Sequence, residues 1–260
     1  MGSSIEKAAF QPPNPEYTRS VAEKNKDRFE ECKTTSGLKV SFIQSPYKGP
    51  NHSGLSVLFC HGNAVDLGTG FPFFIALSRE MKADVFAFDY SGYGLSSGTP
   101  TETNSYACVD AIFRHMTESL KIPRQRIVVF GQSLGSGIAT DLAARQRGLG
   151  GLILMTPLTT AVSVMNSAVL SFMLSPVDRF TNKDKIKKVV DYPILIVHGT
   201  EDEVVPFKHG QQLYELALSV NKATKCLWLQ GCGHNNIPSM KGPEFYRELS
   251  DFVALAATKP

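Results

Sequence analysis

The sequence predicts an α/β protein with a mostly parallel central sheet and helices on both faces. From about residue 55 onward, short apolar runs rich in Val, Ile and Phe alternate with longer amphipathic stretches, and each apolar run ends in a glycine or a polar turn. The chain has 260 residues, of which 42% are hydrophobic, and this is enough to bury one substantial core. We therefore expect a single domain over residues 26–260, preceded by a Pro-rich N-terminal extension over residues 1–25.

The predicted elements begin with a hairpin and continue as βα repeats. The hairpin lies within residues 29–45, turns near Ser36 and Gly37, and forms an antiparallel edge of the sheet. Six strands follow, at residues 55–62, 84–92, 126–133, 151–157, 193–199 and 224–231. The helices between and after them are expected at residues 73–82, 103–120, 136–147, 208–219 and 244–257. Right-handed crossovers distribute these helices over both faces of the sheet.

Charge, hydropathy and cysteine content exclude several classes of protein. Lys and Arg number 27 against 24 Asp and Glu, and the resulting net charge of +3 is too near neutral for binding nucleic acid through its phosphates. No apolar run approaches the roughly 18 residues that cross a bilayer, and the first residues lack the apolar core of a signal peptide. The five cysteines are scattered and odd in number, which is typical of a reducing compartment. We expect a cytoplasmic protein.

The sharpest local signal is a pentapeptide, Gly131-Gln132-Ser133-Leu134-Gly135, between a predicted strand and a predicted helix. A serine on such a tight turn has a strained backbone and an exposed hydroxyl, and the residues two before and two after it must be small. The alternative is a glycine-rich helix start at which Ser133 merely caps the helix. The strand-to-helix context favours Ser133 as a nucleophile.

An acid and a histidine follow two later strands, which gives the chain order serine, acid, histidine expected with a G-x-S-x-G turn. Asp202 comes after the strand at 193–199, and His234 comes after the strand at 224–231. Because functional groups gather at the carboxyl ends of parallel strands, all three residues are expected at one edge of the sheet. His234 is the candidate general base, and Asp202 the residue that orients its imidazole. Should Asp202 not fill this role, Glu201, Glu203 and Asp178 are the nearby alternatives.

A tetrahedral intermediate also needs two hydrogen-bond donors for its oxyanion. The backbone N–H of Leu134, directly after the serine, is one candidate. The backbone N–H of Asn63, in the turn after the first central strand, is the other, with Gly62 permitting that turn. His61 in the same turn is interpreted as a structural hydrogen-bonding residue and not as a second base.

Two weaker patterns point to other functions. Gly92, Gly94 and Gly98 follow a strand, but their spacing differs from that of a dinucleotide-binding loop. Cys226, Cys232 and His234 lie close in sequence, but they lack a fourth ligand and the paired spacing of a metal site. We therefore expect no metal and no organic cofactor.

Taken together, several motifs resemble one family of enzymes. These motifs are HGNAVD, FDYSGYGLSSG, GQSLG, HGTEDEVVPFKHG and GCGHNN, with AAFQPPNPEYT near the start. They are similar to those of the α/β-hydrolase domain-containing protein 17 family of serine hydrolases. The resemblance implies the α/β-hydrolase fold with a minimal cap, and it implies Ser133, Asp202 and His234 as the catalytic triad. Members of that family carry an acylated cysteine cluster ahead of the domain, whereas the first cysteine here is Cys32.

The same resemblance implies a substrate and a location. The family consists of protein depalmitoylases, which cleave the thioester between a fatty acyl chain and a cysteine of a membrane-bound protein. The chain is therefore expected to act on S-acylated proteins, with peripheral contact to the cytosolic face of membranes. Lysines 183, 185, 187 and 188 are interpreted as a solvated face, with contact to anionic lipid as the alternative.

The residues themselves leave the substrate more open than the chemistry. Four apolar residues after the fourth central strand are candidates for an acyl groove, namely Val162, Met165, Leu170 and Met173. Packing of an ordinary helix onto the core explains them equally well. We expect a serine hydrolase that cleaves acyl esters or thioesters. The alternatives are a general carboxylesterase or lipase-like hydrolase of small esters, and a catalytically silent scaffold that binds acyl groups or a partner.

Overall fold

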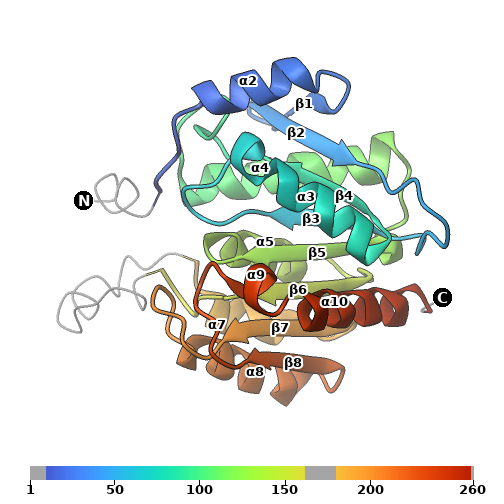
Figure 1. Cartoon of the computed structure of the whole chain (residues 1–260), viewed down its shortest axis with the longest axis vertical. Helices are drawn as coiled ribbons and strands as arrows, with labels where there is room; N and C mark the ends of the chain where they lie inside the picture. The colour runs from blue at the N-terminus through green and yellow to red at the C-terminus, as the bar shows by residue number, and fades with distance from the viewer. Residues whose placement is uncertain (1–9, 162–179, 259–260) are drawn as a thin grey trace.

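One sheet of eight strands runs through the computed structural model, which describes residues 10–161 and 180–258 (Figure 1). Its strand order is β1-β2-β4-β3-β5-β6-β7-β8. The strands are β1 (Phe29–Lys33), β2 (Lys39–Ser45), β3 (Ser56–Cys60), β4 (Asp84–Phe88), β5 (Ile127–Gln132), β6 (Gly151–Met155), β7 (Ile194–Gly199) and β8 (Thr224–Leu229). Strands β1 and β2 form the antiparallel edge, and all pairings from β4 to β8 are parallel. The predicted fold class is confirmed.

Helices cover both faces of this sheet (Figure 1). On one face, α3 (Leu67–Met81) and α10 (Gly242–Ala257) enclose one apolar cluster; on the other, α4 (Glu102–Arg114), α5 (Leu134–Arg145) and α8 (Lys208–Val220) enclose a second. The alternation of strand side chains supplies both clusters, since Val128 and Phe130 of β5 belong to the first and Ile127 and Val129 to the second. The described part contains no helix that is both long and apolar enough to cross a membrane.

The Pro-rich N-terminal region contains a helix that the sequence did not predict. Residues ahead of β1 include the helix α2 (Glu16–Lys24), which packs against α3. Thr18 of α2 is buried and donates a hydrogen bond of 2.5 Å to Asp66, and a Cβ atom at Gly68 of α3 would collide with Thr18. Phe10 is also buried in the core. The domain boundary at residue 25 stays a prediction, but residues 10–24 pack on the domain that follows.

Helix α3 begins six residues earlier than the sequence predicts. Its N-cap is Asp66, whose carboxylate accepts a hydrogen bond of 2.9 Å from the backbone N–H of Thr69, while the backbone N–H of Asp66 donates to the hydroxyl of Thr69. This reciprocal cap starts the helix despite the glycines of its first turn and Pro72 within it. Two further short helices, α7 (Asn182–Lys185) and α9 (Ile237–Met240), were not expected.

Candidate active site

The carboxyl ends of four strands bring the sequence-predicted residues to one edge of the sheet. Ser133 follows β5, Asp202 follows β7, His234 follows β8 and Asn63 follows β3. Their strands lie in the order β3-β5-β6-β7-β8, with β6 between β5 and β7. The four residues share this edge because parallel strands all end on the same side of the sheet, which is the usual location of sites in open α/β sheets.

Ser133 occupies a strained turn between β5 and α5. Its φ of 51° and ψ of −118° place a non-glycine residue in a sparsely populated region of backbone space. The glycines on either side are required by close approach, because a Cβ atom at Gly135 would collide with the carbonyl group of Cys60, and one at Gly131 would collide with the backbone of α5. The turn therefore holds the Ser133 side chain out of the helix and half exposed.

A continuous chain of hydrogen bonds joins Ser133, His234 and Asp202. His234 Nε2 lies 2.9 Å from Ser133 Oγ, and His234 Nδ1 lies 2.8 Å from Asp202 Oδ2. The other carboxylate oxygen, Oδ1, accepts hydrogen bonds from the backbone N–H groups of Val204 at 2.9 Å and Val205 at 2.7 Å. Because a carboxylate only accepts, Nδ1 of His234 carries a proton, and Nε2 is left to accept the proton of Ser133.

The surroundings of Asp202 keep it ionised. Burial alone would raise the pKa of Asp202, but hydrogen bonds from His198 and His234, together with the backbone N–H of Val205, outweigh burial and hold the pKa well below its usual range. A permanent negative charge therefore faces His234 Nδ1. Such a charge favours the protonated over the neutral form of a neighbouring imidazole.

His198, the penultimate residue of β7, is a site residue that the sequence interpretation missed. Its Nε2 lies 2.9 Å from the carbonyl oxygen of Val205 and 3.1 Å from Asp202 Oδ2, and its side chain is fully buried. Since both neighbours accept hydrogen bonds, Nε2 carries the proton and donates toward both. Asp202 is thus held by two imidazoles. The available signal was a histidine inside an otherwise apolar strand, four residues before the acid.

Asn63 is held in place by two distant parts of the chain. Its side-chain Oδ1 accepts hydrogen bonds from the hydroxyl of Tyr93 at 2.7 Å and from the backbone N–H of Gln11 at 2.9 Å. The preceding Gly62 lies against Ser133, since a Cβ atom there would be 3.6 Å from Ser133 Cβ. Leu134 is the first residue of α5, so its backbone N–H is one of those that a helix leaves without an intrahelical partner.

Removal of the Tyr93 hydroxyl is expected to weaken catalysis more than binding. Tyr93→Phe should lower kcat by about tenfold with little change in KM, because Asn63 loses one of its anchors and its backbone N–H is less well placed for an oxyanion. Steady-state kinetics on a short-chain ester measure both constants. Tyr192→Phe is the matched control, since Tyr192 also donates from a buried hydroxyl, to the carbonyl of Ala143 away from the site. Equal loss of kcat in both variants would contradict this role.

His61 lies beneath this loop and takes a structural place. It is fully buried, stacks on Tyr90 with ring centroids 4.0 Å apart, and its Nδ1 lies 2.8 Å from the carbonyl oxygen of Gly62. Burial lowers the pKa of His61 to about 4. The residue is therefore neutral at neutral pH, and it contacts the loop backbone and not Ser133.

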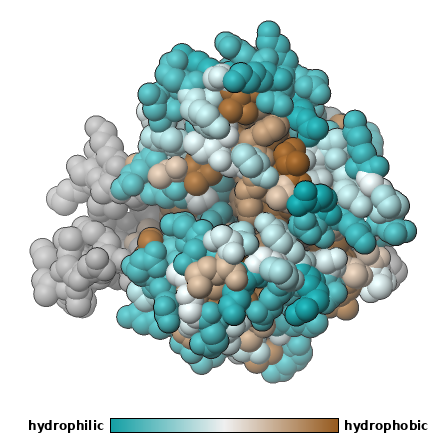
Figure 2. Space-filling model, in the orientation of Figure 1, coloured by the Kyte–Doolittle hydropathy of each residue, from teal (hydrophilic) through white to brown (hydrophobic). Residues whose placement is uncertain are grey.

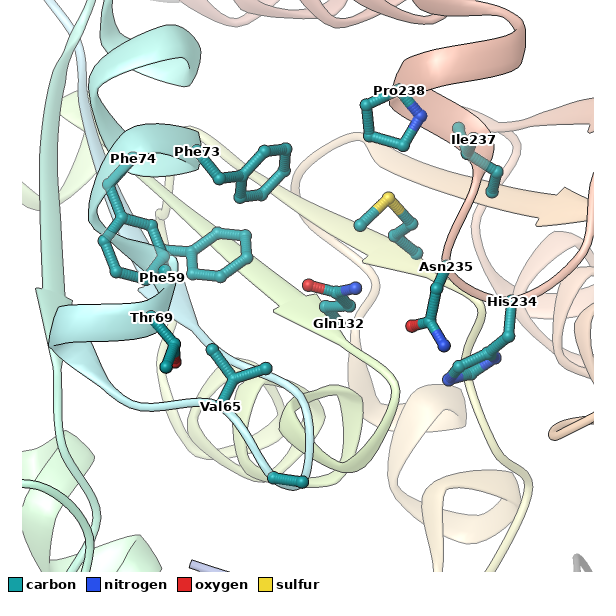
Figure 3. A pocket seen from close by; sticks show the side chains of 13 residues that line it. Phe59, Val65, Thr69, Phe73, Phe74, Gln132, His234, Asn235, Ile237 and Pro238 are labelled. Atoms are coloured by element: carbon teal, nitrogen blue, oxygen red, sulfur yellow. The ribbon is translucent and has the colours of Figure 1, made fainter. Parts of the chain in front are cut away.

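An apolar pocket of about 300 Å³ opens beside the triad (Figure 3). Its walls come from α3, β3, β5, β6 and the turn that leads into α9, and Figure 2 shows apolar surface between α3 and α9. His234 and Gln132 border it, and its apolar lining includes Phe59, Phe73, Phe74, Met155, Ile237 and Pro238. The four residues expected in an acyl groove, Val162, Met165, Leu170 and Met173, lie outside the described residues.

The cysteines do not form disulfides, and the described residues contain no cluster of three His, Cys, Asp or Glu side chains that could hold a metal ion. Cys232 is buried in the loop that carries His234, and Cys226 lies on β8.

The alternative acids also have definite places. Glu201 is exposed, Glu203 accepts from the backbone N–H of His234 at 3.3 Å, and Asp178 lies outside the described residues.

Comparison with known proteins identifies related sequences. A family model described as the alpha/beta hydrolase fold matches residues 56–182. Alpha/beta hydrolase domain-containing protein 17B of Homo sapiens is 35% identical over 277 residues, covering 97% of this chain and 91% of that protein. Alpha/beta hydrolase domain-containing protein 17C of Mus musculus is 40% identical over 202 residues, covering 78% of this chain and 60% of that protein.

Solved structures share the fold at lower sequence identity. An esterase of Pyrococcus furiosus superposes with a TM-score of 0.71 at 17% identity, covering 87% of this chain and 91% of the esterase. An alpha-beta hydrolase of Vibrio vulnificus also gives a TM-score of 0.71, at 20% identity, covering 89% of this chain and 86% of that structure. The sheet and its surrounding helices are therefore those of the α/β-hydrolase fold.

Proposed function

Because the chain belongs to the α/β-hydrolase domain-containing protein 17 family, we propose that it is a serine hydrolase that cleaves acyl esters and thioesters through an acyl-Ser133 intermediate. The observation that carries the proposal is the unbroken hydrogen-bonded chain from Asp202 through His234 to the strained Ser133. A scaffold without catalysis has no need of a serine held in this backbone conformation against an imidazole.

The proposed reaction follows from the positions of the protons. His234 Nε2 takes the proton of Ser133 Oγ as that oxygen attacks the acyl carbon, and the backbone N–H groups of Leu134 and Asn63 receive the developing oxyanion. As the tetrahedral intermediate collapses, His234 gives the proton to the leaving sulfur or oxygen. Water then repeats the sequence on the acyl enzyme, which releases the fatty acid and restores Ser133.

The proposed substrate is an S-palmitoylated protein. The family resemblance implies this substrate, and the apolar pocket beside His234 supports a fatty acyl group over a polar one. A general carboxylesterase or lipase-like hydrolase would use the same triad on small esters. A depalmitoylase and a general esterase differ in the size and the leaving group of the preferred substrate.

Peripheral contact with the cytosolic face of membranes is proposed together with this substrate. Lys183, Lys187 and Lys188 are exposed and available to anionic headgroups. Lys185 departs from the expected solvated face, because its Nζ lies 2.8 Å from Asp141 Oδ1 and 2.6 Å from the hydroxyl of Tyr106. The proposed contact surface therefore excludes Lys185.

The test compares two substrates and two proteins under identical conditions. A palmitoyl-cysteine peptide and a short-chain p-nitrophenyl ester are each incubated with wild type and with Ser133→Ala. The depalmitoylase is supported if wild type cleaves the thioester with a higher kcat/KM than the short ester and Ser133→Ala does not cleave it. Turnover of the short ester alone shows a general esterase. If neither substrate is turned over and a fluorophosphonate does not label Ser133, the proposal is overturned and the chain is a catalytically silent scaffold.

A further inference from the structure

We infer that the pocket between α3 and α9 holds the acyl chain of the substrate while Ser133 attacks its carbonyl carbon. The inference rests on the proposed function and assigns one part of the substrate to one cavity. The pocket is lined by the proposed base His234, and two further lining residues, Gln132 and Ala64, are the chain neighbours of Ser133 and Asn63 (Figure 3).

The deep end of the pocket is suited to hydrocarbon. Phe59, Phe74, Met155 and Ile237 are 0%, 1%, 2% and 1% exposed, so they form a close-packed apolar floor under the pocket that they line. Water in such a space finds few hydrogen-bond partners, and an apolar chain that displaces it gains free energy. Among the described lining residues, His234 is the one side chain that can carry a charge.

The mouth of the pocket differs from its interior. The amides of Gln132 and Asn235 lie between the phenylalanine side chains and His234, and the Gln132 amide points into the cavity (Figure 3). An occupant would thus present a polar group near Ser133 and an apolar tail toward Phe59 and Met155. An acyl group attached through its carbonyl carbon has this arrangement.

Size decides which half of the substrate enters. A volume of about 300 Å³ lies at the lower end of the range for small-molecule sites. The polypeptide of an S-acylated protein is far larger than this space, so most of the leaving group must remain outside. The hydrocarbon tail is the part that fits.

The central experiment changes one wall and keeps a matched control. Phe73 lines the pocket, whereas Phe71 of the same helix is also half-buried but stacks on Phe29 outside it. Phe73→Ala is expected to lower kcat/KM for methyl decanoate by about tenfold while changing that for methyl acetate by less than about twofold, because only the long chain loses contact with the ring. Phe71→Ala should leave both values near those of wild type.

A second variant fills the cavity, so the test remains interpretable even if Phe73→Ala is unstable. Val65 is half-buried, and its side chain points into the pocket (Figure 3). Val65→Trp should likewise lower kcat/KM for the decanoate by about tenfold and spare the acetate. Decyl acetate, which carries the long chain on the leaving group, should respond to neither variant. If both variants change the decanoate and the acetate equally, or if the loss follows decyl acetate, the assignment is overturned.

Direct binding separates this inference from the proposed function. The fluorescent fatty acid cis-parinaric acid is titrated into wild type, Phe71→Ala, Phe73→Ala and Val65→Trp. About tenfold weaker binding by Phe73→Ala and Val65→Trp supports the acyl pocket. If no ester is hydrolysed in the same experiments, the proposed function fails but the acyl site stands. Equal binding by all four proteins, alongside normal hydrolysis, leaves the hydrolase intact and removes the acyl pocket.

Discussion

Replacement of Ser133 by alanine is expected to lower kcat by as much as about a millionfold, or roughly 8 kcal/mol of transition-state stabilisation. The variant loses the oxygen that lies 2.9 Å from His234 Nε2, so no acyl enzyme forms. His234→Ala should cost about as much, because triad residues act as a unit and their effects do not add. Single-turnover kinetics with a short-chain ester measure the loss.

The fold should survive the serine substitution, since alanine keeps the same backbone demands at φ 51°. Ser105→Ala is the matched control: Ser105 is buried and donates within α4 to the carbonyl of Thr101, away from the site. Thermal unfolding of the three proteins should be similar. Retention of more than a hundredth of the wild-type kcat by Ser133→Ala would show that another group is the nucleophile.

Asp202→Asn is expected to lower kcat by about ten-thousandfold through the wrong histidine tautomer. Oδ1 of Asp202 accepts from the backbone N–H groups of Val204 and Val205, so the amide oxygen of asparagine must stay there. The NH₂ group then faces His234 Nδ1 and requires it to accept. The proton moves to Nε2, which can no longer accept from Ser133.

The same substitution sets the new NH₂ group against the N–H of His198, 3.1 Å away in wild type. Two donors facing each other add a loss of stability to the loss of activity. The pH–rate profile and the urea midpoint report these effects separately. Glu201→Gln is the control, because Glu201 is exposed on the same loop. If Asp202→Asn retains full activity while Glu203→Gln or Asp178→Asn loses it, one of those acids is the partner of His234.

Local sequence predicted the strands and the residues that end them. That Ser133, Asp202 and His234 lie together could be predicted because each follows a short apolar run, and the parallel sheet brings the ends of such runs together. His198 was missed for the complementary reason. It lies inside a strand, and its partners Asp202 and Val205 belong to the loop that follows. The sequence alone does not reveal that this loop folds back against His198.

Long-range packing explains the other differences. Helix α2 and the early start of α3 depend on each other through Thr18, Asp66 and Gly68, and none of these contacts joins neighbours in sequence. The pocket beside His234 likewise combines side chains of α3, β6 and α9 that are distant in sequence; Phe73 and Met155, for example, are 82 positions apart. Periodicity detects an element and its buried face, but it does not identify the opposing element.

The contact between Gln11 and Asn63 has a consequence for how this enzyme can be probed by genetics. Gln11 contributes its main-chain N–H, and its own side chain is exposed. An alanine scan would therefore record Gln11 as dispensable, since every residue except proline supplies the same donor. Gln11→Pro, or removal of the chain through residue 11, is needed to expose the dependence of the loop that carries Asn63 on a segment 52 residues upstream.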